Sequence, residues 1–294
     1  MQEEGLLKSL IYKLALIVPD SLYVRLKYRK NLGKWPNLSY PKTFNEKICW
    51  LRLNDHNPHY AKLVDKYEVK KYVADIIGEE HIIPTLGVWE RAEDIDFDSL
   101  PNQFVMKCNH DSGRIIICKD KDKLDKEWAR REMAKSLKRD FYAITREWPY
   151  KNVSRKIIAE QYMVDESGKE LKDYKFFCFN GRVEFCKVDY GRFKEHHANY
   201  YDPVWNLLPF GEVSCSPDFE KKMDCPPNLD KMMEFAGRLS KEIPFARIDL
   251  YNIKGHSFFG EITFFPAGGM GQFTPIEADE EIGKLLVLPK QIHR

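Results

Sequence analysis

Several common signals are missing from this sequence of 294 residues. It has no Cys-x-x-Cys pair and no histidine spacing that suits zinc, so we expect its seven cysteines to be buried free thiols in a reducing compartment. No apolar run reaches the roughly 18 residues of a membrane span, and no signal-peptide cleavage pattern is present. The net charge of +2 argues against nucleic acid as the main partner. These absences favour a cytoplasmic globular protein.

The N-terminal segment has a different character from the rest of the chain. A helical stripe of leucine and isoleucine occupies residues 6–17, and residues 1–34 carry seven Lys and Arg against three Asp and Glu. An apolar stripe followed by basic residues suits a helix that lies on an anionic membrane surface, at the inner face of the membrane. The alternative is an ordinary helix packed on the body of the protein.

A predicted hairpin near the C-terminus carries the clearest chemical signal. Residues 245–251 and 257–263 are β-prone and flank a short segment with Asn and Gly. In such a hairpin Asp249 and Glu261 lie opposite each other, with Cβ atoms roughly 4.5–5.5 Å apart, close enough to share divalent ions. Strict alternation would give the second strand one face made of Ser257, Phe259, Glu261 and Thr263. The alternative is a ladder of salt bridges between Arg247, Asp249 and Glu261 on a solvated face.

Other segments carry candidate phosphate-binding lysines. Lys107 ends a strand before a small-residue loop with Ser112 and Gly113, which suits a phosphate clamp, although Asp111 in that loop is an acid near the expected phosphates. No Gly-Lys-Ser/Thr sequence follows a glycine-rich turn, which excludes a P-loop. Lys175 begins the first strand of a hairpin whose turn is Asn-Gly, although lysines on edge strands also keep sheets soluble. Lys66 lies in a single helix predicted over residues 58–77, where it could be an ordinary surface lysine.

Two further clusters have competing interpretations. Asp94 and Asp96 resemble the metal motif of glycosyltransferases, but no apolar strand precedes them, and we interpret them as part of a solvated loop. Beyond the second hairpin, Asp189, Arg192, His196 and His197 could meet a substrate or could be solvated polar residues. Neighbouring histidines in an extended chain point to different sides, so we expect at most one of these two to be functional.

The ordered set of motifs resembles the TupA-like ATP-grasp family. Lys-Thr-Phe-Asn-Glu-Lys at 42–47, Leu-Val-Asp-Lys-Tyr at 63–67, Phe-Val-Met-Lys-Cys-Asn-His at 104–110 and Asp-Tyr-Lys-Phe-Phe-Cys-Phe-Asn-Gly at 173–181 carry the resemblance, together with Arg-x-Asp and Gly-Glu-x-Thr in the C-terminal hairpin. The chain departs from the family pattern at Thr263, where Asn is usual, and at Asp111, where Gly is usual. The resemblance implies an α+β ATP-grasp fold, in which two α+β subdomains grip ATP behind an N-terminal helical segment.

The resemblance also implies site residues and partners. ATP and Mg²⁺ would be bound, with metal ligands Asp249, Glu261 and Thr263 and with Arg247 and Lys107 as catalytic residues. Nucleotide binding would use a set of eight residues, namely Lys66, Lys107, Ser112, Gly113, Glu160, Gln161, Tyr162 and Lys175. We expect an N-terminal segment at 1–40, helices and a small subdomain at 41–156, and a C-terminal subdomain with the metal site at 157–294.

The implied reaction is the ATP-dependent ligation of a carboxylate to an amine through an acyl phosphate, with ADP as product. The family is associated with teichuronopeptide, capsule and other surface-polysaccharide clusters, so the expected substrates are an amino acid or other amine and a uronic-acid carboxylate. A sugar kinase of the same fold, a glycosyltransferase of the same pathway and a non-catalytic glycan-binding module remain as alternatives.

Overall fold

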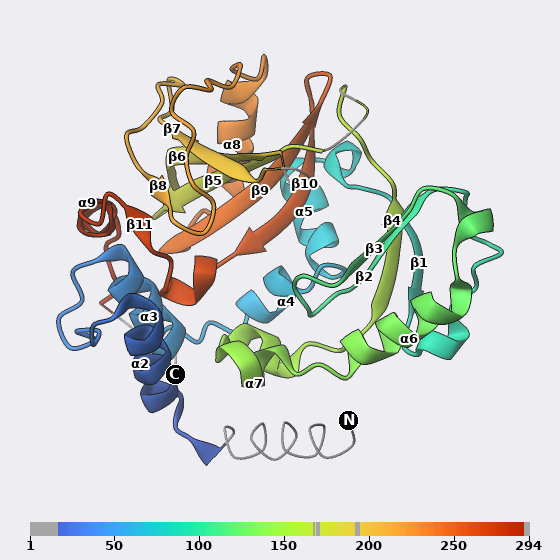
Figure 1. Cartoon of the computed structure of the whole chain (residues 1–294), viewed down its shortest axis with the longest axis horizontal. Coiled ribbons are helices and arrows are strands. Elements are labelled where there is room, and N and C mark those ends of the chain that lie inside the picture. The colour runs from blue at the N-terminus through green and yellow to red at the C-terminus, as the bar shows by residue number, and fades with distance from the viewer. Residues whose placement is uncertain (1–16, 167, 169–170, 192–194, 291–294) are drawn as a thin grey trace.

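The computed structural model describes residues 17–166, 168, 171–191 and 195–290. Eleven strands are assigned within these residues: β1 (Thr85–Trp89), β2 (Phe104–Cys108), β3 (Ile115–Cys118), β4 (Ile157–Gln161), β5 (Asp173–Phe179), β6 (Arg182–Tyr190), β7 (His197–Tyr201), β8 (Gly211–Glu212), β9 (Phe245–Ile253), β10 (His256–Thr263) and β11 (Phe273–Thr274). They form a four-stranded sheet in the order β1-β4-β2-β3, a five-stranded sheet in the order β10-β9-β5-β6-β7, and the pair β11-β8. The two larger sheets lie side by side (Figure 1).

The α-helices assigned within the described residues are α2 (Asp20–Leu32), α3 (Phe44–Asn54), α4 (Tyr60–Val64), α5 (Val69–Ile77), α6 (Lys126–Leu137), α7 (Phe141–Thr145), α8 (Leu229–Leu239) and α9 (Ala278–Leu285). Short 3₁₀ helices lie at η1 (Glu79–His81), η2 (Ala92–Asp94), η3 (Lys121–Lys123), η4 (Trp148–Asn152) and η5 (Pro266–Gly269). The leucine stripe predicted at the N-terminus lies outside the described residues except for Ile17, which is exposed. Among the described residues, none of the helices is long and apolar enough to cross a membrane.

Alternating side chains give the four-stranded sheet two different faces. In β2, Phe104, Met106 and Cys108 are buried and pack in a core with Ala129 and Met133 of α6. The intervening side chains of β2 and β3 point to the opposite face, where Lys107 and the half-exposed Ile115 border a pocket. The alternation therefore puts a packed core on one face and a binding surface on the other.

The five-stranded sheet is built from two tight hairpins and carries the larger core. Asn180 and Gly181 both have positive φ, as do Lys254 and Gly255, so both turns have the backbone of the type I′ class. One face of this sheet is apolar and packs against α8. Six of the seven cysteines are buried free thiols, as expected, but Cys225 is exposed.

The sheets do not divide at the expected boundary between residues 156 and 157. Strand β4 begins at residue 157 and pairs with β1 and β2 of the four-stranded sheet. Helices α3, α4 and α5 belong to the core of the five-stranded sheet, although they precede the four-stranded sheet in the chain. We therefore propose that the small subdomain ends after Gln161 and begins near β1.

A capping box is present at the start of α3. The Thr43 side chain accepts the Glu46 N–H at 3.2 Å, and the Glu46 carboxylate accepts the N–H groups of Thr43, Lys42 and Asn37. Helix α9 then packs closely on this start, because Gly283 leaves no side chain between the two segments.

A substitution at Gly283 tests this contact between α3 and α9. A Cβ at Gly283 would lie 2.3 Å from the Lys42 carbonyl oxygen and 2.8 Å from the Phe44 nitrogen. Gly283→Ala should therefore lower the free energy of unfolding by about 1–3 kcal/mol through overpacking. Glu280→Ala, an exposed position of the same helix, should change it by less than about 0.5 kcal/mol. Equal urea midpoints for the two variants would contradict the packing described here.

Candidate active site

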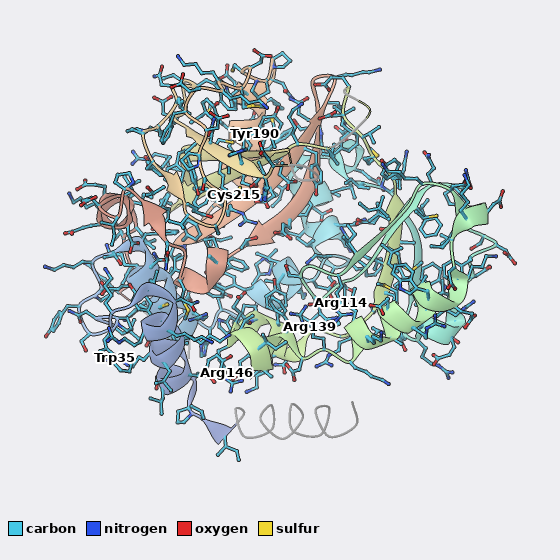
Figure 2. All side chains as sticks on the ribbon, viewed as in Figure 1. Trp35, Arg114, Arg139, Arg146, Tyr190 and Cys215 are labelled. Carbon is cyan, nitrogen blue, oxygen red and sulfur yellow. The ribbon has the colours of Figure 1, made fainter. Side chains whose placement is uncertain are left out.

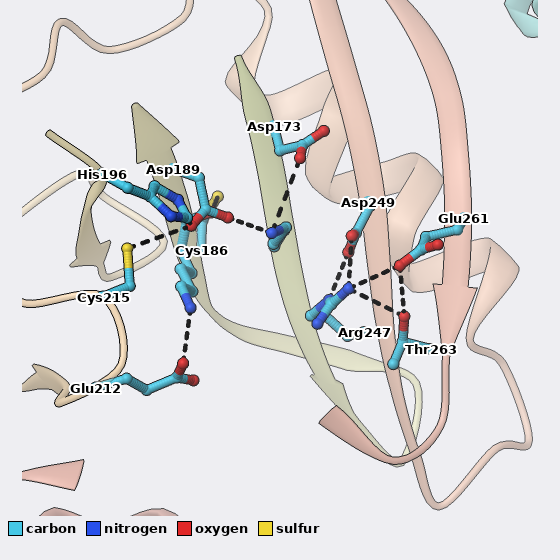
Figure 3. A network of polar contacts seen from close by, with 12 residues as sticks. Asp173, Cys186, Asp189, His196, Glu212, Cys215, Arg247, Asp249, Glu261 and Thr263 are labelled. Carbon is cyan, nitrogen blue, oxygen red and sulfur yellow. Dashed lines mark hydrogen bonds and ion pairs between the residues drawn. The ribbon is translucent and has the colours of Figure 1, made fainter. Parts of the chain in front are cut away.

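The C-terminal hairpin holds a dense ion-pair network (Figure 3). Arg247 donates two hydrogen bonds of 2.7 Å to the carboxylate of Asp249, and its Nη2 also donates to Glu261 at 2.9 Å and to the Thr263 hydroxyl at 3.0 Å. The Thr263 hydroxyl in turn donates to Glu261 at 3.0 Å. The register confirms that Asp249 and Glu261 lie opposite each other. The same contacts constitute the salt-bridge ladder that the sequence left open as an alternative.

This network is less exposed than an ordinary surface ladder. The side chain of Asp249 is 5% exposed and that of Arg247 is 15% exposed, whereas Glu261 at 39% reaches the adjoining cavity. Burial, opposed by Arg247 and supported by repulsion from Glu261, raises the pKa of Asp249 to about 6. For Glu261, burial is outweighed by Lys66 and Arg247, and the pKa falls to about 2. A charged side chain of opposite sign is therefore needed to keep both carboxylates ionised here.

A bulge corrects the face predicted for β10. The register shifts between Phe259 and Glu261, so Gly260 is an additional residue on this strand. Phe259 pairs with Leu250 and is buried in the core, whereas Glu261 pairs with Asp249. The prediction that Phe259 and Glu261 share a face was wrong, because strict alternation fails across a bulge. A Cβ at Gly260 would lie 3.0 Å from the Asp249 carbonyl oxygen, which explains glycine at this position.

The single helix predicted over residues 58–77 is two helices, α4 and α5. The Asp65 side chain accepts the N–H groups of Tyr67 and Glu68 at 2.8 and 3.2 Å, and the break before α5 lies there. Lys66 therefore lies in the break, where its Nζ donates to the Asp111 carbonyl at 3.0 Å and lies 3.9 Å from Glu261. The break makes Lys66 a cavity residue rather than a surface residue on a continuous helix.

The acid of the loop after β2 ties this loop to the C-terminal end of α6. The Asp111 carboxylate accepts hydrogen bonds from Ser136 at 2.9 Å, from Arg139 at 2.8 Å and from the Ser112 N–H at 2.7 Å. Arg139, labelled in Figure 2, lies between α6 and α7. The Asp111 side chain is 1% exposed and its charge is neutralised by Arg139. It therefore presents no uncompensated negative charge to the phosphates expected in the cavity. It anchors the loop that holds Ser112 and Gly113.

A buried carboxylate positions Lys107. Glu160 lies 2.6 Å from the Lys107 ammonium and 2.7 Å from that of Lys70, and its side chain is 7% exposed. Burial alone would raise the pKa of Glu160, but the two ammonium groups outweigh it and lower the pKa. The carboxylate of Glu160 thus forms ion pairs with both Lys70 and Lys107. Lys70, which sequence reasoning did not single out, also donates to the Thr85 hydroxyl at 2.7 Å.

Two adjoining pockets run along the four-stranded sheet toward the hairpin. The first is mainly apolar and is lined by Val105, Ile115, Ile117, Met163, Val164 and Leu171, together with Glu160, Gln161 and Tyr162. The second is polar and is lined by Lys66, Ser112, Gly113, Lys175, Asp249 and Glu261. Lys107, Ile115 and Tyr251 border both, so the two pockets form one elongated site. An apolar end and a cationic end suit a flat aromatic ring joined to a polyanion.

Lys175 lies at the centre of the five-stranded sheet. It pairs with Asp249 on β9 and Lys187 on β6, and its ammonium contacts the carboxylates of Asp189 and Asp173. The prediction placed this residue at a strand start on a possible edge, but β5 is flanked by β9 and β6. Lys175 is thus an internal, half-buried residue of the cavity rather than a solubilising edge lysine.

The structure brings all twelve residues of the predicted nucleotide, metal and catalytic set together. Ten of them line the two pockets, and Arg247 and Thr263 contact the carboxylates at the polar end. Asp173, Lys119 and Tyr251 also line the site and were missed, because no local motif marks a residue that only strand pairing brings there. Asp94 and Asp96 line neither pocket; Asp96 caps its own loop by accepting from Asp98 and Ser99.

The donor set fits a hard divalent cation. Asp249 and Glu261 supply carboxylate oxygens on neighbouring strands, and Thr263 adds a hydroxyl, which are the oxygen ligands that Mg²⁺ prefers. Arg247 already supplies positive charge between them. Lys66, Lys107 and Lys175 line the same cavity and fit a polyphosphate.

The two sheets enclose one elongated site, which lies between strand β2 with Lys107 and the acidic hairpin of β9 and β10. This arrangement is that of an ATP-grasp protein. The chain belongs to the TupA-like ATPgrasp family, whose model matches residues 46–287. Among proteins of curated function, none matches this sequence.

Solved structures with a similar fold have low sequence identity. They include a D-alanine–D-alanine ligase from Bacillus anthracis complexed with ATP (16% identity, TM-score 0.39, 69% of this chain and 54% of that chain). A second is a D-alanine–D-alanine ligase from Helicobacter pylori (14%, TM-score 0.42, 83% and 69%). A third is the ATP-grasp ligase PsnB with minimal precursor, Mg and ADP (9%, TM-score 0.39, 70% and 52%). The chain thus spans about half the length of the first and the third.

Charge-removing variants test the two carboxylates as cation ligands. Asp249→Asn and Glu261→Gln should each weaken Mn²⁺ binding in the presence of ADP by at least about tenfold, equivalent to about 1.4 kcal/mol. Because protons compete with cations for Asp249, whose pKa is about 6, wild-type affinity should be constant well above pH 6 and fall as the pH drops through 6. Electron paramagnetic resonance of free Mn²⁺ measures both effects.

The control for this measurement is Asp94→Asn, which removes an exposed charge outside the site. Its Mn²⁺ affinity should match that of the wild type, and thermal unfolding should show that all three variants remain folded. Wild-type affinity in both Asp249→Asn and Glu261→Gln would show that the hairpin is only a salt-bridge ladder.

Proposed function

We propose that this protein is an ATP-dependent ligase that joins a carboxylate to an amine through an acyl phosphate and releases ADP. The observation that carries the proposal is the single elongated site, whose apolar end passes into a cavity lined by Lys66, Lys107 and Lys175 and closed by the acidic hairpin. Within the TupA-like family, the resemblance to surface-polysaccharide proteins points to a uronic-acid carboxylate and an amino acid or other amine as substrates.

The adenine ring would occupy the apolar pocket between the side chains of β2 and β3 and the segment of Gln161 and Tyr162. The triphosphate would then extend past Lys107 toward Lys66 and Lys175, with the loop of Ser112 and Gly113 beside it. Glu160 would act on the nucleotide indirectly, since its carboxylate holds the Lys107 ammonium in place. These lysines are positioned before ATP arrives, so little reorganisation is required on binding.

Mg²⁺ held by Asp249, Glu261 and Thr263 would neutralise the charge that develops on the phosphoryl oxygens. Side chains of the protein would assist the phosphoryl transfer and the attack of the amine. Lys107 and Lys175 would orient the γ-phosphoryl group toward the substrate carboxylate, which attacks phosphorus and displaces ADP. Arg247 would stabilise the oxyanion that forms when the amine attacks the acyl carbon.

The nucleotide product and a trapping reaction test this proposal. With ATP, a panel of uronic acids and hydroxylamine in place of the amine, the protein should release ADP and accumulate a hydroxamate, because hydroxylamine captures acyl phosphates. Lys107→Ala should lower the rate of hydroxamate formation by about 10²-fold or more, since it removes a positioned charge from the phosphates. Colorimetric detection of the hydroxamate and chromatography of the nucleotides provide the readout.

The control variant is Lys123→Ala, because the side chain of Lys123 is 83% exposed and lies outside both pockets. It should form hydroxamate at the wild-type rate. AMP as the nucleotide product would contradict the acyl-phosphate route, and ADP with a stable phosphorylated sugar would indicate the kinase instead.

We also propose that the protein works in the cytoplasm at the inner face of the membrane, through its N-terminal segment. Helix α2 packs on the body through Val24 and Tyr28, but Leu22 and Leu26 on it are 46% and 49% exposed. Trp35, labelled at the outer edge in Figure 2, is 57% exposed. Exposed apolar side chains beside basic ones fit an anionic lipid surface, where a lipid-linked glycan would be presented.

Liposome sedimentation tests the membrane contact. Deleting residues 1–18, or replacing both Leu22 and Leu26 with Gln, should reduce binding to anionic vesicles several-fold, because each change removes apolar contact area. ATP binding should be unchanged, since Leu22 and Leu26 lie outside the pockets. Vesicle binding equal to that of the wild type in both variants would show that the segment only packs on the body.

A further inference from the structure

A polar cluster lies next to the site but outside its pocket walls. His196 Nε2 lies 3.0 Å from Oδ1 of Asp189, and the Cys215 sulfur lies 3.8 Å from the same oxygen. The other oxygen of Asp189 contacts the ammonium of Lys175. Figure 3 shows Asp189 between His196 and Cys215 on one side and the strand of Lys175 on the other. One buried carboxylate thus links His196 to a lysine of the proposed phosphate site.

The pairing of β6 with β7 explains why only one of two adjacent histidines joins this cluster. Asp189 pairs with Ala198, and Tyr190 pairs with His197. Because side chains alternate, residues 196 and 198 share the face of Asp189, whereas His197 lies on the face of Tyr190. His197 accordingly stacks on Tyr190 and contacts the Ser216 carbonyl at 2.9 Å.

The hydrogen bond fixes the protonation pattern of a neutral His196. An ionised carboxylate can only accept, so Nε2 carries the hydrogen and Nδ1 keeps a free lone pair. The His196 side chain is 44% exposed whereas that of Asp189 is 2% exposed, so a substrate can reach the ring but not the acid. A buried acid that orients an exposed imidazole is the arrangement of a general base.

The three side chains also have the mixed donor set of a metal site, but the charges nearby favour a different role. Lys175 already neutralises Asp189, and Lys187 pairs with Glu212 at 2.8 Å close to the cluster. Burial raises the pKa of the Cys215 thiol to about 11, with Asp189 contributing, so the thiol is protonated at neutral pH. A protonated thiol is not a nucleophile, and a metal ion would have to displace its proton before the sulfur could bind it.

We infer that His196, oriented by Asp189, is the general base that deprotonates the amine substrate. This inference rests on the proposed ligase function. An ammonium group R–NH₃⁺ transfers one proton to Nδ1 of His196, and the imidazolium is stabilised by Asp189. The freed lone pair attacks the acyl carbon, the bond from that carbon to the phosphate oxygen breaks, and phosphate leaves with the electron pair. The second proton lost by the nitrogen leaves with the phosphate, and His196 returns its proton to solvent.

Comparing two nucleophiles isolates this step. Hydroxylamine is already unprotonated at neutral pH and needs no base, whereas an amino acid such as glycine or glutamate is protonated on its amine. At pH 7, His196→Ala should therefore lower amide formation by about 10²–10⁴-fold, while hydroxamate formation stays within about threefold of the wild type. Raising the pH should restore amide formation in His196→Ala, because solvent then deprotonates the amine, an effect that a purely structural role would not produce.

His197→Ala is the matched control and should resemble the wild type with both nucleophiles. Equal loss of the amide and the hydroxamate in His196→Ala would show that the residue supports the first half of the reaction or the fold, and would overturn the inference. Unchanged amide formation would overturn it as well. A wild-type protein that forms neither ADP nor hydroxamate would instead contradict the proposed function, and the inference with it.

Discussion

The structure depends on how two facing carboxylates are neutralised on neighbouring strands. Asp249 is almost completely buried and directly opposes Glu261, so the pair would repel without a positive charge between them. In the described structure the Arg247 guanidinium supplies that charge by contacting both acids. Removing one member of a buried pair typically costs about 3–5 kcal/mol, so the position of Arg247 is strongly determined. The same requirement makes the hairpin a favourable site for a divalent cation.

The three lysines of the polar pocket follow the same rule, because each is held by an acid or a carbonyl. Lys107 is held by Glu160, Lys175 by Asp189 and Asp173, and Lys66 by the carbonyl of Asp111. These lysines come from three separate segments of the chain, and they converge only because α5 and the two sheets pack together. A polyphosphate would therefore meet positive charges that are already in position, which is the form of electrostatic stabilisation that requires least rearrangement.

Local patterns in the sequence predicted the hairpins and the opposition of Asp249 and Glu261, since each depends on a short stretch of sequence. The face of Phe259 was predicted wrongly, because a bulge at Gly260 is decided by close approach to the Asp249 backbone. The helix break at Lys66 was missed because it depends on the Asp65 side chain. The neutralisation of Asp111 was missed because it depends on hydrogen bonds from Ser136 and Arg139. Contacts between distant segments, such as those of Asp111, leave no periodic signal in the sequence, whereas the contact of Asp65 with Tyr67 and Glu68 is local.

The most direct measurement is a crystal structure with a non-hydrolysable ATP analogue and Mn²⁺, with anomalous diffraction recorded to locate the ion. We predict an anomalous peak within coordination distance of Asp249 and Glu261, with the adenine between Ile117 and Tyr162 and the phosphates beside Lys107. An analogue bound elsewhere, or an ion bound at Asp94 and Asp96 with none at the hairpin, would contradict this prediction.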